Sequence, residues 1–236
     1  MLIKGLGKGL MDYFENIPVL SKGPEAYKGE GIPSPSLALT FDDGPISPYT
    51  KDLLDVLAAY HIIATFFLVG RNVERHPELA CRVVDEGHAV GNHSYSHRPL
   101  LPALLPTFLI QDTLRAKRAI YRVTDYRTWL FRPPYGHRSP WMAQILRRLD
   151  YRIVLWHISF GNWRETEKAS TKRISERLFP GAVILLHDLI AKELPERYKD
   201  CSPKGLLSNL LESCLQKGYN FVTVPELLKT GKGQRS

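Results

Sequence analysis

Cysteine is scarce in this sequence, whose 236 residues include only Cys81, Cys201 and Cys214. None of the three belongs to a Cys-x-x-Cys pair, and their odd number does not suit a framework of disulfides. The sequence therefore predicts neither a disulfide-stabilised fold nor a zinc site built on cysteine. This cysteine usage favours a reducing compartment.

Long apolar segments are also lacking. No stretch is long and apolar enough to span a bilayer. Gly5, Gly7 and Gly9 interrupt the segment in which a cleavable signal peptide would have its apolar region. We therefore expect a protein of the cytoplasm or of the cytoplasmic membrane face, unless a leader has been removed.

Acidic residues are outnumbered by basic ones, 24 to 32, which gives a formal net charge of +8. A basic surface suits an anionic partner, but no run of five or more Lys and Arg residues occurs, so we do not expect a nucleic acid. Peripheral contact with an anionic membrane is compatible with this charge. Leu2, Leu6, Leu10 and Phe14 recur at roughly helical spacing. They indicate either an interfacial amphipathic helix or, as we favour, an arm packed on the domain.

From residue 37 onward, apolar runs alternate with segments of helical periodicity. The expected strands are 37–41, 64–69, 88–91, 128–131, 152–156, 182–186 and 221–224, and the expected helices are 49–60, 77–86, 104–121, 141–149, 171–178, 203–217 and 225–229. This alternation predicts one α/β domain over residues 37–230, after a lead-in over residues 1–36. Its parallel strands should form a closed or nearly closed (β/α) barrel, and a flat doubly wound sheet is the alternative.

Two adjacent carboxylates, Asp42 and Asp43, follow the first expected strand in the sequence Thr40-Phe41-Asp42-Asp43-Gly44. Like charges beside an apolar core repel each other and lose solvation, which a bound cation would offset. Taken alone, these five residues are more simply explained as a polar turn. The other motifs favour the cation.

A pair of histidines, His93 and His97, follows the expected strand 88–91. Their spacing of four residues predicts that both lie on one face of a helical turn, close enough to share one metal ion. One carboxylate and two imidazoles would leave coordination positions open, as a catalytic metal requires.

Two further polar clusters also follow expected strands. Arg132 and Tyr135 lie in the loop Arg132-Pro133-Pro134-Tyr135-Gly136, whose prolines restrict the backbone, and Leu185 and His187 end the strand near residue 186. Arg132 can pair with a carboxylate, a backbone N–H of this loop can face an oxyanion, and His187 can act as a general acid. Each has a purely structural alternative, a surface turn or a core histidine.

In this order, the four motifs resemble those of the polysaccharide deacetylases, the NodB homology domains of carbohydrate esterase family 4. The resemblance spans roughly residues 37–190 and implies a distorted (β/α) barrel that removes N-acetyl groups from amino sugars with a divalent metal. Zinc would be the usual metal, with Co²⁺, Ni²⁺ or Mn²⁺ as alternatives. By motif position, the resemblance implies these roles: Asp42, catalytic base; Asp43, His93 and His97, metal ligands; Arg132, orientation of the base; Tyr135, oxyanion N–H; His187, general acid; Leu185, acyl pocket.

The fourth family motif is only partly present. Trp163 matches, but Ser159 and Asn162 stand where the family usually has aspartates. An amide at position 162 can orient an imidazolium but supplies no charge to stabilise it. We therefore expect general-acid catalysis by His187 to differ from that step in other family members.

The sequence thus predicts a metal-dependent hydrolase that removes the N-acetyl group of a polymeric, oligomeric or lipid-linked amino sugar. The alternatives are a deformylase or deacetylase of a lipid-linked amino sugar and a non-catalytic carbohydrate-binding relative. The retained base Asp42 argues against the binding protein, because it is not needed to hold a metal.

Overall fold

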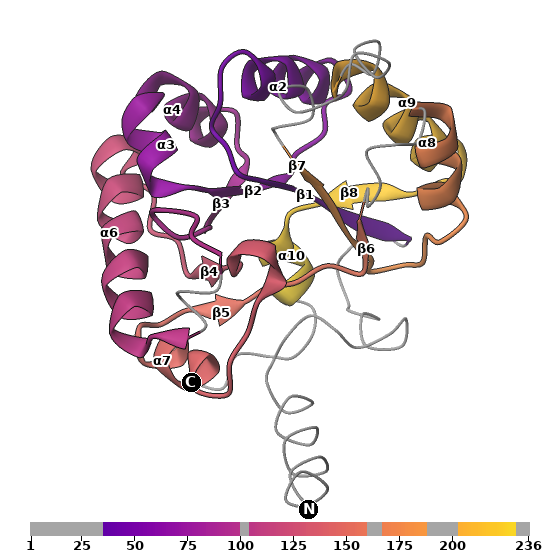
Figure 1. The fold of residues 1–236 in the computed structure, drawn as a ribbon. Helices are drawn as coiled ribbons and strands as arrows, with labels where there is room; N and C mark the ends of the chain where they lie inside the picture. Colours follow the sequence, from indigo (N-terminus) through magenta and orange to yellow (C-terminus); the bar gives the residue numbers. More distant parts are fainter. Residues whose placement is uncertain (1–34, 100–103, 160–166, 188–202, 230–236) are drawn as a thin grey trace, which may run out of the picture.

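A computed structural model describes residues 35–99, 104–159, 167–187 and 203–229. Strands and helices alternate along the chain, as the sequence predicts (Figure 1). The strands are β1 (Ser36–Asp42), β2 (Thr65–Leu68), β3 (Ala89–Asn92), β4 (Leu130–Phe131), β5 (Arg152–Ile153), β6 (Ile158–Ser159), β7 (Val183–His187) and β8 (Asn220–Val222). The helices are α2 (Tyr49–Ala59), α3 (Gly70–Arg75), α4 (Pro77–Asp85), α6 (Pro106–Thr124), α7 (Met142–Arg148), α8 (Glu167–Ser175), α9 (Pro203–Gln216) and α10 (Val224–Lys229), and a 3₁₀ turn, η2, covers Pro134–Gly136.

All strand pairs are parallel, in the order β5-β4-β3-β2-β1-β7-β6, and β8 pairs with the first residues of β1. The sheet is curled, with most helices around its outside and α10 against its inner face (Figure 1). Between its two end strands, β5 and β6, the described residues form no ladder. This arrangement confirms the distorted (β/α) barrel and excludes the flat doubly wound sheet.

The central strand β1 is buried along its whole length, which is typical of a parallel strand covered on both faces. Leu37, Leu39 and Phe41 belong to the apolar cluster shared with α2 and α9. Ala38 belongs to a different cluster, inside the curl of the sheet. Because side chains alternate along a strand, Thr40 and Asp42 lie on the same inner face as Ala38.

The structure corrects several expected boundaries. Helix α3 and strand β6 were not predicted, and the expected helix 171–178 is instead α8, four residues earlier at its start. The expected strands 128–131 and 152–156 shrink to two residues each, in β4 and β5. Helix α3 begins at Gly70, where a Cβ would lie 2.8 Å from the Cα of Ala116 in α6. Only glycine permits such a close approach of two helices.

Among the described residues, no helix combines the length and the apolar character that crossing a membrane requires. Residues 1–34 lie outside the described part of the chain. The boundary between a lead-in over 1–36 and a domain over 37–230 therefore stays a prediction.

Candidate active site

The carboxylates of Asp42 and Asp43 point in different directions, because strand β1 ends between these two residues. Asp42 is its last residue and is 2% exposed. Asp43 has a φ of 78°, a left-handed conformation that few non-glycine residues adopt. The side-chain amide of Asn72 donates a hydrogen bond of 2.7 Å to the backbone oxygen of Asp43 and holds this turn. Asp43 can therefore turn its carboxylate away from the inner face that Asp42 occupies.

The histidine pair lies in a loop after β3, so the prediction of a helical turn was wrong. The backbone is left-handed at Ser94, with φ 67°, and at His97, with φ 51°. Two side chains close the loop: Oδ1 of Asn92 accepts the Ser94 N–H at 2.8 Å, and Oγ of Ser94 accepts the His97 N–H at 2.9 Å. The loop nevertheless brings the rings of His93 and His97 together, with centroids 5.0 Å apart.

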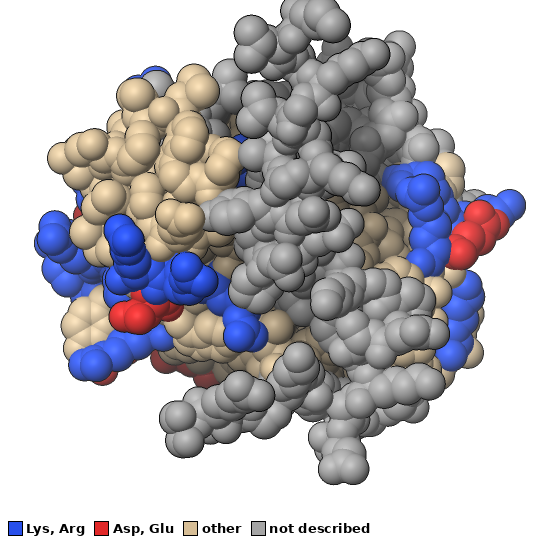
Figure 2. Space-filling model, turned by 90° about the horizontal axis from the view of Figure 1, so that it is seen from below, with Lys and Arg blue, Asp and Glu red and all other residues tan. Residues whose placement is uncertain are grey.

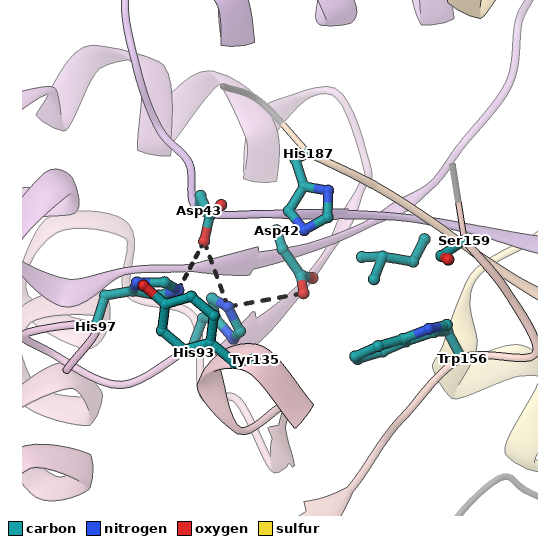
Figure 3. A pocket seen from close by; sticks show the side chains of 9 residues that line it. Asp42, Asp43, His93, His97, Tyr135, Trp156, Ser159 and His187 are labelled. Atoms are coloured by element: carbon teal, nitrogen blue, oxygen red, sulfur yellow. Dashed lines mark ion pairs between the residues drawn. The ribbon is translucent and has the colours of Figure 1, made fainter. Parts of the chain in front are cut away.

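Asp43, His93 and His97 form the group of metal-ligand type that the sequence predicts (Figure 3). Oδ1 of Asp43 lies 3.5 Å from Nε2 of His93 and 2.9 Å from Nε2 of His97. This oxygen is buried and meets no donor in hydrogen-bonding geometry. An oxygen and two imidazole nitrogens that converge in this way suit a divalent ion such as zinc.

The surroundings of His93 and Asp43 favour a cation. Nδ1 of His93 lies 2.7 Å from the backbone oxygen of Arg132, which can only accept, so Nδ1 carries a proton and Nε2 is the nitrogen left to bind a metal ion. Burial alone would raise the pKa of Asp43, but its interactions with both histidines outweigh burial and hold this pKa well below its usual range. Asp43 is therefore anionic, as a metal ligand would need to be.

Arg132, at the end of β4, is fully buried behind Asp42. Its Nη1 donates to Oδ1 of Asp42 at 2.7 Å and to Oγ1 of Thr40 at 2.8 Å. Nε and Nη2 donate to the backbone oxygens of Val154 and Leu155. Since Arg132 occupies Oδ1, the other oxygen of Asp42, Oδ2, is the one that lies 3.7 Å from Nε2 of His93.

A cavity of about 250 Å³ opens above these groups. Leu185 and His187 reach it from β7, whose His187 is the register partner of Asp42 in β1. In Figure 3, His187 lies on the opposite side of Asp42 from His93 and His97. The residues that line the cavity are Asp42, Asp43, His93, His97, Tyr135, Trp156, Ser159, Leu185 and His187.

Tyr135 forms one wall of the cavity. It lies in the turn η2 with a φ of 58°, and its ring centroid is 4.9 Å from that of His97. The next residue, Gly136, is also left-handed, and a Cβ there would lie 2.9 Å from the ring of Trp156. The turn therefore packs directly against Trp156. This packing fixes the position of Tyr135.

The structure thus brings together eight of the ten predicted site residues. Asn162 and Trp163 lie outside the described residues. The sequence reasoning missed Thr40 and Trp156. Thr40 could have been found, because it is two residues before Asp42 on the same face of a strand, whereas nothing in the sequence signals that Trp156 lines the cavity.

Comparison with known proteins identifies the family. A profile of the polysaccharide deacetylases matches residues 30–154. A peptidoglycan-N-acetylglucosamine deacetylase from Bacillus cereus is 31% identical over 200 residues, which are 84% of this chain and 70% of that protein. The chain belongs to the polysaccharide deacetylase family. Other relatives are longer, and the chain spans 42% of the peptidoglycan-N-acetylglucosamine deacetylase PgdA from Listeria monocytogenes, to which it is 32% identical over 89% of its own length.

Solved structures of polysaccharide deacetylases have the same fold. The Bc1960 peptidoglycan N-acetylglucosamine deacetylase superposes with a TM-score of 0.78 at 29% identity and covers 95% of this chain and 99% of its own. BA3943 from Bacillus anthracis, a pseudoenzyme of carbohydrate esterase family 4, superposes with a TM-score of 0.72 at 25% identity over 82% of this chain and 65% of its own. Membership confirms the predicted resemblance, the fold class and the prediction of a hydrolase of this metal-dependent family.

Proposed function

We propose that this polysaccharide deacetylase removes N-acetyl groups from the amino sugars of a peptidoglycan-type polymer. Relatives at 31–32% identity are named for this substrate. The observation that carries the proposal is the position of Asp42. Its free oxygen Oδ2 faces the cavity 3.7 Å from Nε2 of His93, beside a three-residue metal site that does not need it. A carboxylate in this position serves catalysis rather than metal retention.

We propose Zn²⁺ as the metal, because two imidazole nitrogens and one carboxylate oxygen are a donor set that zinc favours while keeping an open position. Co²⁺, Ni²⁺ and Mn²⁺ accept the same donors and remain alternatives. A divalent ion held by Asp43, His93 and His97 would polarise the acyl carbonyl and lower the pKa of a water molecule.

The residues around this site can carry out the remaining steps of amide hydrolysis. Asp42 takes a proton through Oδ2 from the water that attacks the acyl carbon, while Arg132 holds Oδ1 in place. The backbone N–H of Tyr135 donates a hydrogen bond to the developing oxyanion. His187 gives a proton to the nitrogen as the C–N bond breaks, which releases an amine and acetate. Leu185 and Trp156 line the space for the acyl methyl group.

The competing functions give different results in one experiment. The protein is reconstituted with Zn²⁺, and acetate or formate release is measured from polymeric, oligomeric and lipid-linked N-acetylated and N-formylated amino sugars. We expect acetate from the polymer, and no release by Asp42→Asn, which should still bind one zinc ion per chain. Release only from a lipid-linked or formylated sugar would support the deformylase alternative. Stoichiometric zinc without turnover on any substrate would support a binding protein.

The compartment remains a prediction of the sequence. A peptidoglycan-type substrate lies outside the cytoplasm, whereas the sequence favours the cytoplasm or the cytoplasmic membrane face. Fractionation of cells that produce the full-length protein, followed by protease treatment of intact cells, distinguishes the two. Protection from the protease would contradict a polymeric wall substrate.

A further inference from the structure

One corner of the molecule, where α6, α7 and β5 meet, carries several exposed cations and aromatic rings. The exposed cations are Arg127, Arg147, Arg148 and Arg152, and the exposed aromatic side chains are Tyr121, 41% exposed, and Trp129, 38% exposed. We call these six residues the basic corner. Figure 2 shows one of two groups of Lys and Arg side chains, with a few Asp or Glu among them, on the left side of the molecule, the side on which α6 and α7 lie in Figure 1.

Contacts join four members of the basic corner in two pairs. The Arg152 N–H donates to the backbone oxygen of Trp129 at 2.8 Å, and the Arg152 guanidinium lies 5.8 Å from the centre of the Trp129 ring. The Arg127 guanidinium lies 5.4 Å from the Tyr121 ring. Each exposed ring therefore has a cation beside it.

Among the described residues, no salt bridge neutralises the four arginines of the basic corner. The exposed acids nearest in sequence are Asp125, which ends α6, and Asp150, which follows α7. Neither has a salt bridge with the four arginines. Arg118, also exposed on α6, adds a further positive charge, so cations outnumber acids here.

The basic corner and the active site lie at opposite ends of the sheet. Trp129 directly precedes β4 and Arg152 begins β5, whereas Asp42, His93 and His187 lie where their strands end. All strands are parallel, so their starts share one end of the sheet and their ends share the other. An anionic ligand at the basic corner would therefore not be the group that reacts at the metal.

Strand β1 also begins at this end of the sheet, at Ser36. Residues 1–34 precede it in the sequence and place Lys4 and Lys8 between Leu2, Leu6 and Leu10. Such a pattern suits an interfacial segment.

We propose that the basic corner docks the protein on an anionic lipid bilayer, with the mouth of the active site turned away from the membrane. Arginines attract acidic headgroups, and amphipathic rings such as those of Trp129 and Tyr121 are favoured at the level of the headgroups. In this orientation the enzyme presents its cavity to a polymer beyond the membrane rather than to a lipid-linked sugar within it. The proposal goes beyond the deacetylase activity and does not depend on it.

The experiment measures binding of the full-length protein to vesicles of phosphatidylcholine, with and without 30% phosphatidylglycerol, by sedimentation. We expect binding only to the anionic vesicles, weakened by raising the salt from about 0.1 to about 0.5 M. The variant Arg127→Gln/Arg148→Gln/Arg152→Gln should bind about 100-fold more weakly, given the typical contribution of each surface cation. Its matched control, Lys51→Gln/Arg71→Gln/Arg177→Gln, loses the same charge from exposed positions elsewhere and should bind as the wild type does.

Tryptophan fluorescence tests the contact itself. A blue shift on binding to anionic vesicles is expected in the wild type and should disappear in Trp129→Phe. Equal losses in the two triple variants, equal binding to neutral vesicles, or a shift that persists in Trp129→Phe would overturn the proposal. Binding to purified cell-wall polymer in the absence of any vesicle binding would also overturn it and assign the corner to an acidic polysaccharide.

Discussion

Nη1 of Arg132 donates a hydrogen bond of 2.7 Å to Oδ1 of Asp42, and the two side chains are 0% and 3% exposed. A buried pair of this kind loses most when one partner alone is removed, because the remaining charge is left without compensation. The pair therefore links the stability of the domain to the geometry of its candidate base.

A double-mutant cycle measures this link. Arg132→Met should lower the free energy of unfolding of the metal-free protein by about 3–5 kcal/mol. Adding Asp42→Asn to Arg132→Met should restore part of that loss, because it removes the isolated carboxylate. Urea denaturation of the four proteins checks this, with Lys51→Met, from an exposed pair with Asp55, as a control that should cost less than about 1 kcal/mol. Strictly additive losses would contradict the prediction.

Thr40 should act as a positioning residue for the base. Its hydroxyl accepts a hydrogen bond from Nη1 of Arg132 and donates to the backbone oxygen of Ile184, both at 2.8 Å. Thr40→Val leaves a donor of the buried guanidinium unsatisfied, which typically costs about 1–3 kcal/mol. We expect kcat to fall about tenfold or more with little change in KM, and Thr40→Ser to restore it. Steady-state kinetics that show equal loss in the valine and serine variants would refute this role.

His88 should make the fold sensitive to mild acid. Its Nδ1 accepts the backbone N–H of Ala64 at 3.1 Å, and burial lowers its pKa from 6.5 to about 4 despite the nearby Glu86. Between these two values the unfolded chain binds a proton that the folded chain does not, so stability falls as the pH falls from about 6.5 to about 4. The full loss from this residue is about 3 kcal/mol.

Urea denaturation across this pH range tests the role of His88. In His88→Asn, the side-chain oxygen can accept the Ala64 N–H but does not titrate. The variant should therefore be less stable than the wild type near neutral pH and should lose less stability as the pH falls. Parallel pH dependences in the two proteins would show that other groups cause the acid sensitivity.

Asn162→Asp tests the incomplete fourth motif. If a carboxylate at this position supports the general acid, as the family resemblance implies, the added charge should keep the acid protonated to higher pH. The basic limb of the pH–rate profile should then move upward. The control Asn220→Asp adds the same charge at the start of β8, away from the cavity, and should leave the profile in place. An unchanged profile in Asn162→Asp would reject the supporting role.

The sequence alone was sufficient for the parts of the molecule that depend on local patterns. The apolar runs of β1, β2 and β7 are long enough to identify strands, and the polar clusters at the ends of β1 and β7 mark the active end of a parallel sheet. The grouping of Asp43, His93 and His97 followed from that rule. Strands β4, β5 and β6 have two residues each. Two residues are too few to show the alternation of apolar and polar side chains, so the boundaries of these strands could not be predicted from the sequence.

The remaining errors come from tertiary contacts that replace local preferences. A spacing of four residues suggested a helical turn for His93 and His97, but the side chains of Asn92 and Ser94 accept backbone hydrogen bonds that hold a left-handed loop there instead. Helix α3 was missed because it begins with a glycine, which a propensity argument counts against a helix. Gly70 is there because α6 passes too close for any side chain.

The pairing of β1 with β7 also bears on the order in which the protein acquires its chemistry. All three candidate metal ligands and Arg132 come from the chain between residues 43 and 132, whereas the contact between Thr40 and Ile184 spans 144 residues. Closing so long a loop is slow compared with local pairing. A growing or partly folded chain can therefore bring its three candidate ligands together before His187, the candidate proton donor, joins them. Such a chain cannot cleave an amide until nearly the whole domain has been synthesised.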